Sequence, residues 1–306
     1  MSRDPLLDIL ERLVTNQLPV TLPTHVAFIV GSTPSKGARS PRLWNAAFRD
    51  LEIDGEMLPL DVSSDQIEHL AKVLEQDQRV AGVAIAAPFK SEFAKLFAGQ
   101  LSPAAQKAGS INLLSRRPDG SFIGSNTDGL AAVESLREVE PNLAEKNTLI
   151  LGCGATGRAV IASLVEVVGT QRVSVVYRDS RHKEWLDGVG VSNFPISSIS
   201  SLLRDYSIVI NCTSVGWGNQ VDQSPLTINE LDLSPKESLV FDVVYQPDPS
   251  KLLVDARSLG LRTVSGSRMN LLQAVLAFCL SLPVAKQELV MESMRNSADS
   301  LTTTKP

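Results

Sequence analysis

Short apolar runs alternate with helical stretches through the first half of the chain. The predicted elements are strands over 25–30, 57–62 and 82–87 and helices over 42–51 and 64–75. Two further runs, 110–114 and 121–124, flank the turn sequence Pro118-Asp-Gly120 and predict a hairpin. Strands that are separated by helices usually pair in parallel, so this half of the chain predicts an α/β layer structure.

The alternation restarts at Thr148. The predicted elements are strands over 148–152, 173–177, 207–211 and 238–244 and helices over 158–168 and 270–280. This rhythm is typical of a doubly wound sheet. We therefore expect an α/β substrate domain over 1–130, completed by helices of 267–306, and a Rossmann-type dinucleotide-binding domain over 131–266. A short helix is expected within 1–12, and the Ser/Thr-rich tail from Ser297 is expected to be disordered.

Composition narrows the class of protein. The chain has 306 residues, of which 43% are hydrophobic and 21% charged, which suits a soluble two-domain enzyme. Its net charge is −5 and it has no dense Lys/Arg run, so a nucleic-acid partner is not expected. No apolar run approaches the ~20 residues of a membrane span, and 1–12 lack the features of a signal peptide. Three scattered cysteines lack metal spacing. We expect a cytoplasmic monomer or homodimer without a metal.

A glycine-rich turn follows the predicted strand 148–152. It reads Gly152-Cys-Gly154-Ala-Thr-Gly157 and leads into a predicted helix. Glycines allow a tight turn and let the backbone approach a pyrophosphate, which the N–H groups and the positive end of the helix dipole attract. The pattern predicts that Gly152, Gly154, Ala155, Thr156 and Gly157 bind a dinucleotide. A tight turn without a ligand is the alternative.

The residues after the next predicted strand should contact the adenosine ribose. Arg178, Arg181 and Lys183 suit a 2′-phosphate, whereas Asp179 suits a 2′-hydroxyl and repels a phosphate. The arginines favour NADP, and the aspartate leaves NAD open. Lys183 and His182 are better interpreted as the solvated start of a helix. We therefore expect an NADP-preferring site that includes Arg178 and Asp179.

Lys90 and Asp128 both follow predicted strands, at the end of the sheet where ligand sites of α/β proteins lie. Hydride exchange between an alcohol and a ketone requires that a proton move at the same oxygen. A lysine ammonium can donate that proton, and a nearby carboxylate can hold the lysine and the hydroxyl in position. Either residue alone is better interpreted as a surface residue. Together they predict an acid–base pair.

Seven motifs in order resemble the shikimate and quinate dehydrogenase family, including the shikimate dehydrogenase domain of the fungal pentafunctional aromatic enzyme, over roughly residues 25–280. The motifs are Arg39-Ser40-Pro41 with Asn45-Ala-Ala-Phe48, Pro88-Phe-Lys90, Ser110-Ile-Asn112, Asn126-Thr-Asp128, Ile210-Asn-Cys-Thr213-Ser-Val-Gly216, Asp242-Val-Val-Tyr245-Gln-Pro247, and Gly266 with Met269-Asn-Leu-Leu-Gln273-Ala274. A fungal enzyme of this type is therefore expected.

The resemblance implies a role for each matching residue. The implied roles are catalysis for Lys90 and Asp128, binding of ring hydroxyls for Asn112 and Gln273, binding of a carboxylate for Ser40 and Tyr245, and contact with the nicotinamide half for Thr213, Val215, Gly266 and Met269. The chain alone also allows Gln273 to bridge helices and Tyr245 to be a core residue.

Four residues depart from the family pattern. Ala38 replaces the first serine of the Ser-x-Ser pair, Ala84 and Ala86 replace polar residues of an Asn-Val-Thr strand, and Trp44 stands where a histidine is usual. A buried hydroxyl that loses its partner costs about 1–3 kcal/mol. We therefore expect a cyclic hydroxy or keto acid related to shikimate but not shikimate itself. Trp44 either adds apolar bulk near the pocket or packs between helices.

Three alternatives remain open at this point. One is a shikimate or quinate dehydrogenase proper. A second is a non-catalytic regulator that senses a metabolite, related to the repressors of quinate use. A third is another cofactor-assisted reaction, such as an imine reduction. The retained Lys90 and Asp128 favour an enzyme.

Overall fold

Two β-sheets organise the chain, and each lies in a unit of its own. The computed structural model describes residues 4–299. One unit comprises the residues up to Thr127 and those from Leu271 onward, and the other comprises Asp128–Asn270. The boundaries expected from the sequence, after residues 130 and 266, lie a few residues away.

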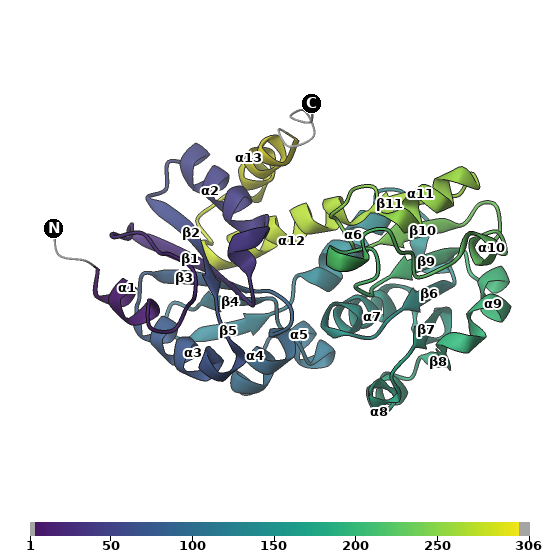
Figure 1. Ribbon diagram of the computed structural model, residues 1–306, viewed down its shortest axis with the longest axis horizontal. Coiled ribbons are helices and arrows are strands. Elements are labelled where there is room, and N and C mark those ends of the chain that lie inside the picture. The colour runs from purple at the N-terminus through teal and green to yellow at the C-terminus, as the bar shows by residue number, and fades with distance from the viewer. Residues whose placement is uncertain (1–3, 300–306) are drawn as a thin grey trace. The chain divides into compact units, whose positions relative to one another are not determined.

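The first unit is built on a mixed sheet with the strand order β2-β1-β3-β4-β5 (Figure 1). Its strands are β1 (His25–Gly31), β2 (Gly55–Asp61), β3 (Val80–Ile85), β4 (Leu113–Arg116) and β5 (Phe122–Ser125). Its helices are α1 (Pro5–Leu10), α2 (Ser40–Asp50), α3 (Ile67–Gln76), α4 (Lys90–Leu96), α5 (Pro103–Ala108), α13 (Gln287–Asp299) and the part of α12 (Gly266–Ser281) from Leu271 onward. β1 pairs in parallel with β2 and β3, and the predicted hairpin adds β4 and β5 in antiparallel pairing.

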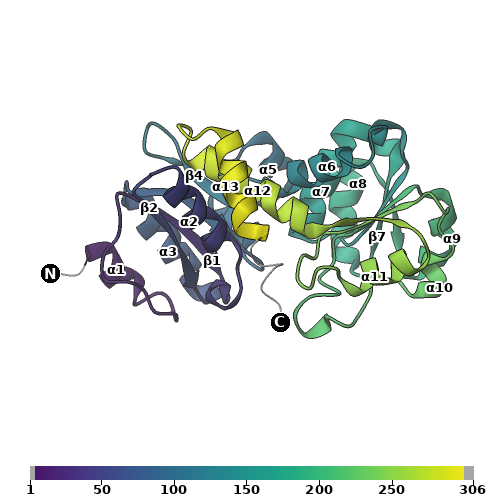
Figure 2. The same ribbon diagram turned by 90° about the horizontal axis from the view of Figure 1, so that it is seen from above.

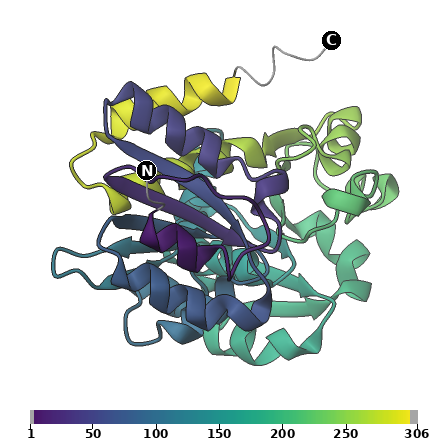
Figure 3. The same cartoon turned by 60° about the vertical axis from the view of Figure 1, so that its left-hand side comes forward.

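Alternate residues of β1 enter two separate apolar cores. Val26, Phe28 and Val30 belong to a core with α1, α3 and α4. Ala27 and Ile29 belong to a core with α2, α12 and α13, and Figure 3 shows α13, in yellow, beside α2. Successive side chains of a strand point to opposite faces of its sheet. A strand that is covered on both faces is apolar along most of its length, which explains the continuous apolar run over 26–30.

The second unit holds a wholly parallel sheet with the strand order β8-β7-β6-β9-β10-β11. Its strands are β6 (Thr148–Leu151), β7 (Val173–Tyr177), β8 (Ser192–Pro195), β9 (Ile208–Asn211), β10 (Leu239–Asp242) and β11 (Arg262–Ser265). Its helices are α6 (Asp128–Arg137), α7 (Ala155–Val168), α8 (Lys183–Val189), α9 (Ile199–Leu202), α10 (Ile228–Leu231) and α11 (Lys251–Ser258). This is the strand order of the Rossmann fold. In Figure 2, α9, α10 and α11 lie on one face of the sheet and α7 on the other.

The predicted α/β fold class is confirmed, and three local predictions need correction. β8 and β11 were not predicted because most of their residues are exposed or half-buried, so neither forms an apolar run. α7 begins at Ala155 and not at Arg158, since Gly154 is the residue that caps it. Residues 297–299 close α13, although the sequence suggests disorder there. The rest of that tail, 300–306, and residues 1–3 lie outside the described residues.

Candidate active site

The glycine turn lies at the switch point of the second sheet, between the neighbouring strands β6 and β9. In doubly wound sheets, ligands bind outside the carboxyl ends of the strands at this point. Gly152 follows β6, and Cys212 and Thr213 follow β9. The backbone N–H of Cys212 donates to the carbonyl of Leu151 at 2.8 Å. The loops after these two strands therefore start side by side.

The three glycines of the turn meet three different requirements. Gly152 has a φ of +95°, which favours glycine. A Cβ at Gly157 would lie 2.5 Å from the carbonyl oxygen of Gly152, so α7 packs against the turn too closely for a side chain. A Cβ at Gly154 would have no heavy atom within 4 Å. Gly154 therefore leaves open space next to the first turn of α7.

This open space fits the pyrophosphate of a dinucleotide. α7 has 14 residues, and Gly154 is its N-cap residue. Ala155 and Thr156 form the first turn, where the positive end of the helix dipole attracts anions. The predicted cofactor residues at the turn thus form a strand–turn–helix unit that suits a dinucleotide.

The carboxylate of Asp179, beyond the end of β7, is held by Arg181. It accepts the backbone N–H of Arg181 at 3.0 Å and pairs with the Nε of Arg181 at 2.5 Å. The N–H and the charge of Arg181 hold the pKa of Asp179 below its ordinary value. Arg178 is exposed beside this pair. The charge of Asp179 is partly balanced, so its repulsion of a 2′-phosphate is weakened.

Further basic side chains gather near this strand end. The guanidinium of Arg158, on α7, lies 5.8 Å from the ring centre of Trp185 on α8. Burial lowers the pKa of His182, and the charges of Arg158 and Arg181 lower it further. Arg158 was not predicted as a site residue, although its position directly after Gly157 was a usable signal. Lys183 pairs with Asp187 at 2.7 Å and is solvated, as expected.

The loop after β9 and the start of α12, which follows β11, carry the other predicted cofactor residues. Thr213 donates both its N–H and its hydroxyl to the Oδ1 of Asn211, and the N–H of Val215 donates to the hydroxyl of Thr213. A Cβ at Gly266 would lie 2.4 Å from the carbonyl oxygen of Val243, so α12 starts in close contact with the loop after β10. Met269 is buried on α12.

Asn112, Thr127 and Gln273 form one hydrogen-bonded network in the first unit. Asn112 donates through Nδ2 to the hydroxyl of Thr127 at 2.8 Å and accepts the N–H of Thr127 at 2.9 Å. The same Nδ2 lies 3.4 Å from the Oε1 of Gln273, and the hydroxyl of Thr127 donates to the Gln273 carbonyl. The structure therefore brings together the two predicted ring-hydroxyl ligands. Thr127 joins them and was not singled out from the sequence.

Lys90 begins α4 immediately beside this network. The N–H of Ile111 donates to the Lys90 carbonyl at 2.9 Å, and the N–H of Ile85 donates to the Asn112 carbonyl at 2.8 Å. These bonds fix the start of α4 against the strand segment that carries Asn112. Ser40 begins α2 in the same unit, whereas Tyr245 lies half-buried in the second.

Asp128 is the buried first residue of α6 in the second unit. Its Oδ2 accepts the hydroxyl of Thr156 at 3.3 Å. A Cβ at Gly129 would lie 2.3 Å from the carbonyl oxygen of Ala159 on α7, so the two helices pack backbone to backbone. The predicted catalytic carboxylate is thus fixed against the helix that starts at the glycine turn.

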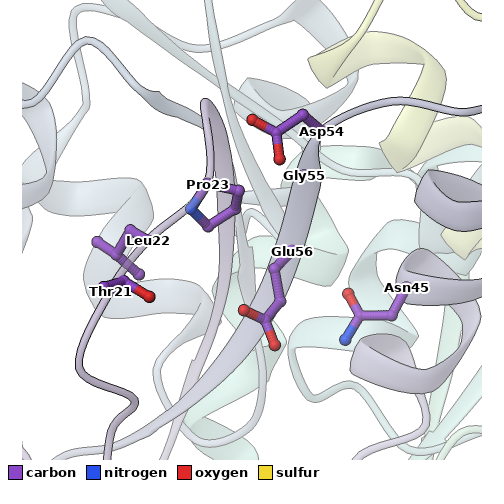
Figure 4. A pocket seen from close by; sticks show the side chains of 7 residues that line it. All are labelled: Thr21, Leu22, Pro23, Asn45, Asp54, Gly55 and Glu56. Carbon is purple, nitrogen blue, oxygen red and sulfur yellow. The ribbon is translucent and has the colours of Figure 1, made fainter.

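An open hollow at the edge strand β2 contains none of the predicted site residues (Figure 4). It is lined by Thr21, Leu22, Pro23, Asn45, Asp54, Gly55 and Glu56. Asn45 uses its amide to bind both the N–H and the carbonyl of Met57 in β2. This motif residue therefore secures an edge strand. Within residues 4–299, His, Cys, Asp and Glu form no group that could hold a metal ion, and the helices contain no apolar segment of membrane-spanning length.

Comparison with known proteins agrees with these observations. A family model described as the shikimate dehydrogenase substrate binding domain matches residues 30–114. An NADP(+) shikimate dehydrogenase of Rhodospirillum rubrum is 34% identical over 263 residues, which span 83% of this chain and 90% of that protein. The chain belongs to the shikimate dehydrogenase family. A shikimate dehydrogenase of Trichormus variabilis is 27% identical over 91% of this chain and 97% of its own length.

Solved structures of shikimate dehydrogenases have the same fold. The Thermus thermophilus shikimate 5-dehydrogenase, solved with NADP(H) and shikimate, gives a TM-score of 0.76 at 25% identity and covers 89% of this chain and 99% of its own. A Corynebacterium glutamicum quinate dehydrogenase gives 0.78 at 23% identity, covers 89% and 99% of the two chains, and supports the fold alone. The relatives named here are bacterial, so they do not support the expected fungal origin. None of them is a regulator, so that alternative has no support.

The four departures from the shikimate dehydrogenase pattern share one apolar environment. Ala38, Ala84 and Ala86 pack against the core that α2 and α12 form. Trp44 belongs to this core and is 1% exposed, with its ring 5.0 Å from that of Phe278. Of the two expectations for Trp44, packing between helices is the one the structure shows.

Proposed function

We propose that this protein is an NADP-preferring oxidoreductase that exchanges a hydride with a cyclic hydroxy or keto acid related to shikimate. The observation that carries the proposal is the Asn112–Thr127–Gln273 network beside Lys90, in a chain whose second sheet carries a dinucleotide turn. The bound dinucleotide supplies the hydride acceptor or donor. The balanced charge of Asp179 and the exposed Arg178 support NADP over NAD.

In this proposal Lys90 moves the proton. During ketone reduction its ammonium protonates the carbonyl oxygen as that oxygen becomes a hydroxyl, and during oxidation the neutral amine takes the proton back. The carboxylate of Asp128 orients Lys90 and the reacting hydroxyl. Asn112 and Gln273 bind ring hydroxyls, and Ser40 and Tyr245 bind the substrate carboxylate. Thr213, Val215, Gly266 and Met269 contact the nicotinamide half.

The alanines set the choice of ring. Ala38, Ala84 and Ala86 offer methyl groups where the family usually has polar side chains, and each ring hydroxyl that faces a methyl loses about 1–3 kcal/mol. Two such losses lower kcat/KM for shikimate by roughly 30-fold to 10⁴-fold. We therefore propose a ring acid with fewer hydroxyls than shikimate. Dehydrogenation of shikimate or quinate itself is the second candidate, which the names of the relatives favour.

A substrate panel with one gain-of-function variant separates the two candidates. The wild-type protein is assayed with NADP and shikimate, quinate and ring acids that lack one hydroxyl. A preference for a ring acid with fewer hydroxyls, and a rise in kcat/KM for shikimate in Ala84→Asn/Ala86→Thr, is the expected result. If the wild-type protein prefers shikimate and the double variant gains nothing, the substrate assignment fails and the second candidate stands.

A further inference from the structure

Three neighbouring strands of the second sheet end in register. Asp242 of β10 pairs with Asn211 of β9, and Asn211 pairs with Leu151 of β6. Gly152, the first glycine of the dinucleotide turn, follows Leu151. Contacts between neighbouring strand ends can therefore connect Asp242 with the glycine turn.

Asp242 is a fully buried carboxylate with three donors. Its Oδ1 accepts the Nδ2 of Asn211 at 2.9 Å and the N–H of Val244 at 3.0 Å, and its Oδ2 accepts the hydroxyl of Ser250 at 2.5 Å. Ser250 also caps α11 by accepting the N–H of Leu253. Asp242 thus ties the end of β9 to the loop after β10 and to the start of α11.

The contact with Asp242 fixes which way the Asn211 amide faces. A carboxylate oxygen only accepts hydrogen bonds, so the NH₂ group of Asn211 must face Asp242. The Oδ1 of Asn211 then points the other way and accepts the N–H of Thr213 at 2.9 Å and its hydroxyl at 2.7 Å. Asn211 is fully buried, so a turned amide would find no water to replace these bonds.

Thr213 passes this constraint on to the glycine turn. With its hydroxyl directed to Asn211, its methyl group lies over Gly152, where a Cβ would come within 2.8 Å of the Thr213 Cγ2. The backbone of Cys212 and the N–H of Thr213 lie 3.3 Å from the same point. The glycine turn therefore packs directly against Thr213.

We propose that Asp242 is a positioning residue of the dinucleotide site, acting through Asn211 and Thr213 on the glycine turn. This inference rests on the proposed function, because it needs a dinucleotide to bind there. Asp242 need not touch the ligand. It sets the place of Thr213 and so the shape of the turn that receives the pyrophosphate.

NADP binding by variants tests whether Asp242 acts through Asn211 and Thr213. Asp242→Ala should weaken NADP binding about tenfold, or about 1.4 kcal/mol, in isothermal titration calorimetry. Asp242→Asn should bind NADP nearly as well as the wild-type protein, because its Oδ1 still accepts from Asn211 while its NH₂ donates to Ser250. Asn211→Ala should weaken NADP binding as much as Asp242→Ala does. The double variant should bind NADP no more weakly than either single variant, because both changes break the same chain of contacts.

A matched control separates positioning from general stability. Val240→Ala removes two buried methyl groups from the same strand, and should lower the melting temperature while leaving NADP affinity intact. If Asp242→Ala does not fold, Thr213→Val carries the test, because it keeps the methyl group that faces Gly152 but loses the hydrogen bond from the hydroxyl to Asn211.

Two outcomes overturn the inference. If Asp242→Ala binds NADP with unchanged affinity, the inference is wrong and the proposed function still stands. The same holds for Thr213→Val where that variant is the one measured. A wild-type protein that binds neither NADP nor NAD overturns the proposed function and this inference together.

Discussion

Gly154 and Gly157 stand three residues apart in one turn, yet their replacement by alanine should have opposite consequences. At Gly154 the backbone angles, φ −72° and ψ −172°, suit alanine, and a Cβ meets no heavy atom within 4 Å. A less flexible unfolded chain stabilises the variant by about 0.4–1 kcal/mol, and the poorer N-cap offsets this by roughly 0.5–1 kcal/mol. The net change in the free energy of unfolding should stay below about 1 kcal/mol.

The methyl group of Gly154→Ala should instead act on the ligand. It fills the open space next to the first turn of α7, where we propose that the pyrophosphate binds. Loss of one or two charge-assisted hydrogen bonds, at about 1.5–3 kcal/mol each, weakens NADP binding by about tenfold to 10⁴-fold. Titration calorimetry and the shift in melting temperature with NADP both measure this change.

Gly157→Ala is the matched contrast. Its Cβ would lie 2.5 Å from the Gly152 carbonyl oxygen, a backbone atom that cannot rotate away, so the folded state should lose about 1–3 kcal/mol. Urea unfolding of the two variants compares these costs. If Gly154→Ala binds NADP as tightly as the wild-type protein, or is destabilised as much as Gly157→Ala, the assignment of the turn is wrong.

Three further predictions address other parts of the molecule. Lys90→Met should lower turnover by about 10²–10⁴-fold in steady-state kinetics while the NADP dissociation constant stays unchanged; full activity would remove Lys90 from the mechanism. The guanidinium of Arg116 donates to five backbone carbonyls, including the end of α3, so Arg116→Met should cost at least about 3 kcal/mol in urea unfolding, and a smaller loss would contradict this role. Burial raises the pKa of Asp242 to about 6, so the native state holds this proton more tightly than the unfolded chain does. The free energy of unfolding should therefore fall by about 3 kcal/mol as the pH rises from about 4 to about 6. Asp242→Asn should remove that dependence, and an unchanged pH profile would show that the carboxyl group is not the cause.

The sequence was sufficient for features that depend on local pattern. The run 25–30 predicted a strand, and the glycine turn predicted the β6–α7 unit, because both signals lie within a few neighbouring residues. β8 and β11 were not predicted, because their residues are mostly exposed or half-buried and so form no local apolar pattern.

Contacts between residues that are far apart in the chain could not be predicted from the sequence. Asn112 and Gln273 stand 161 residues apart in the chain, and only the fold shows that they share a network through Thr127. Trp44 allowed two interpretations until its burial against Phe278 decided between them. Arg116 was overlooked because its partners are backbone carbonyls, which leave no trace in the pattern of side chains.

The central claim is hydride exchange between a nicotinamide dinucleotide and a cyclic hydroxy acid. The most direct measurement follows the absorbance of reduced nicotinamide when the folded protein is mixed with NADP and a panel of ring hydroxy acids. We expect that NADP is reduced with at least one ring acid and that Lys90→Met lowers the rate by about 10²–10⁴-fold. If the protein binds NADP but reduces none of it with any ring acid of the panel, the proposed hydride exchange is wrong.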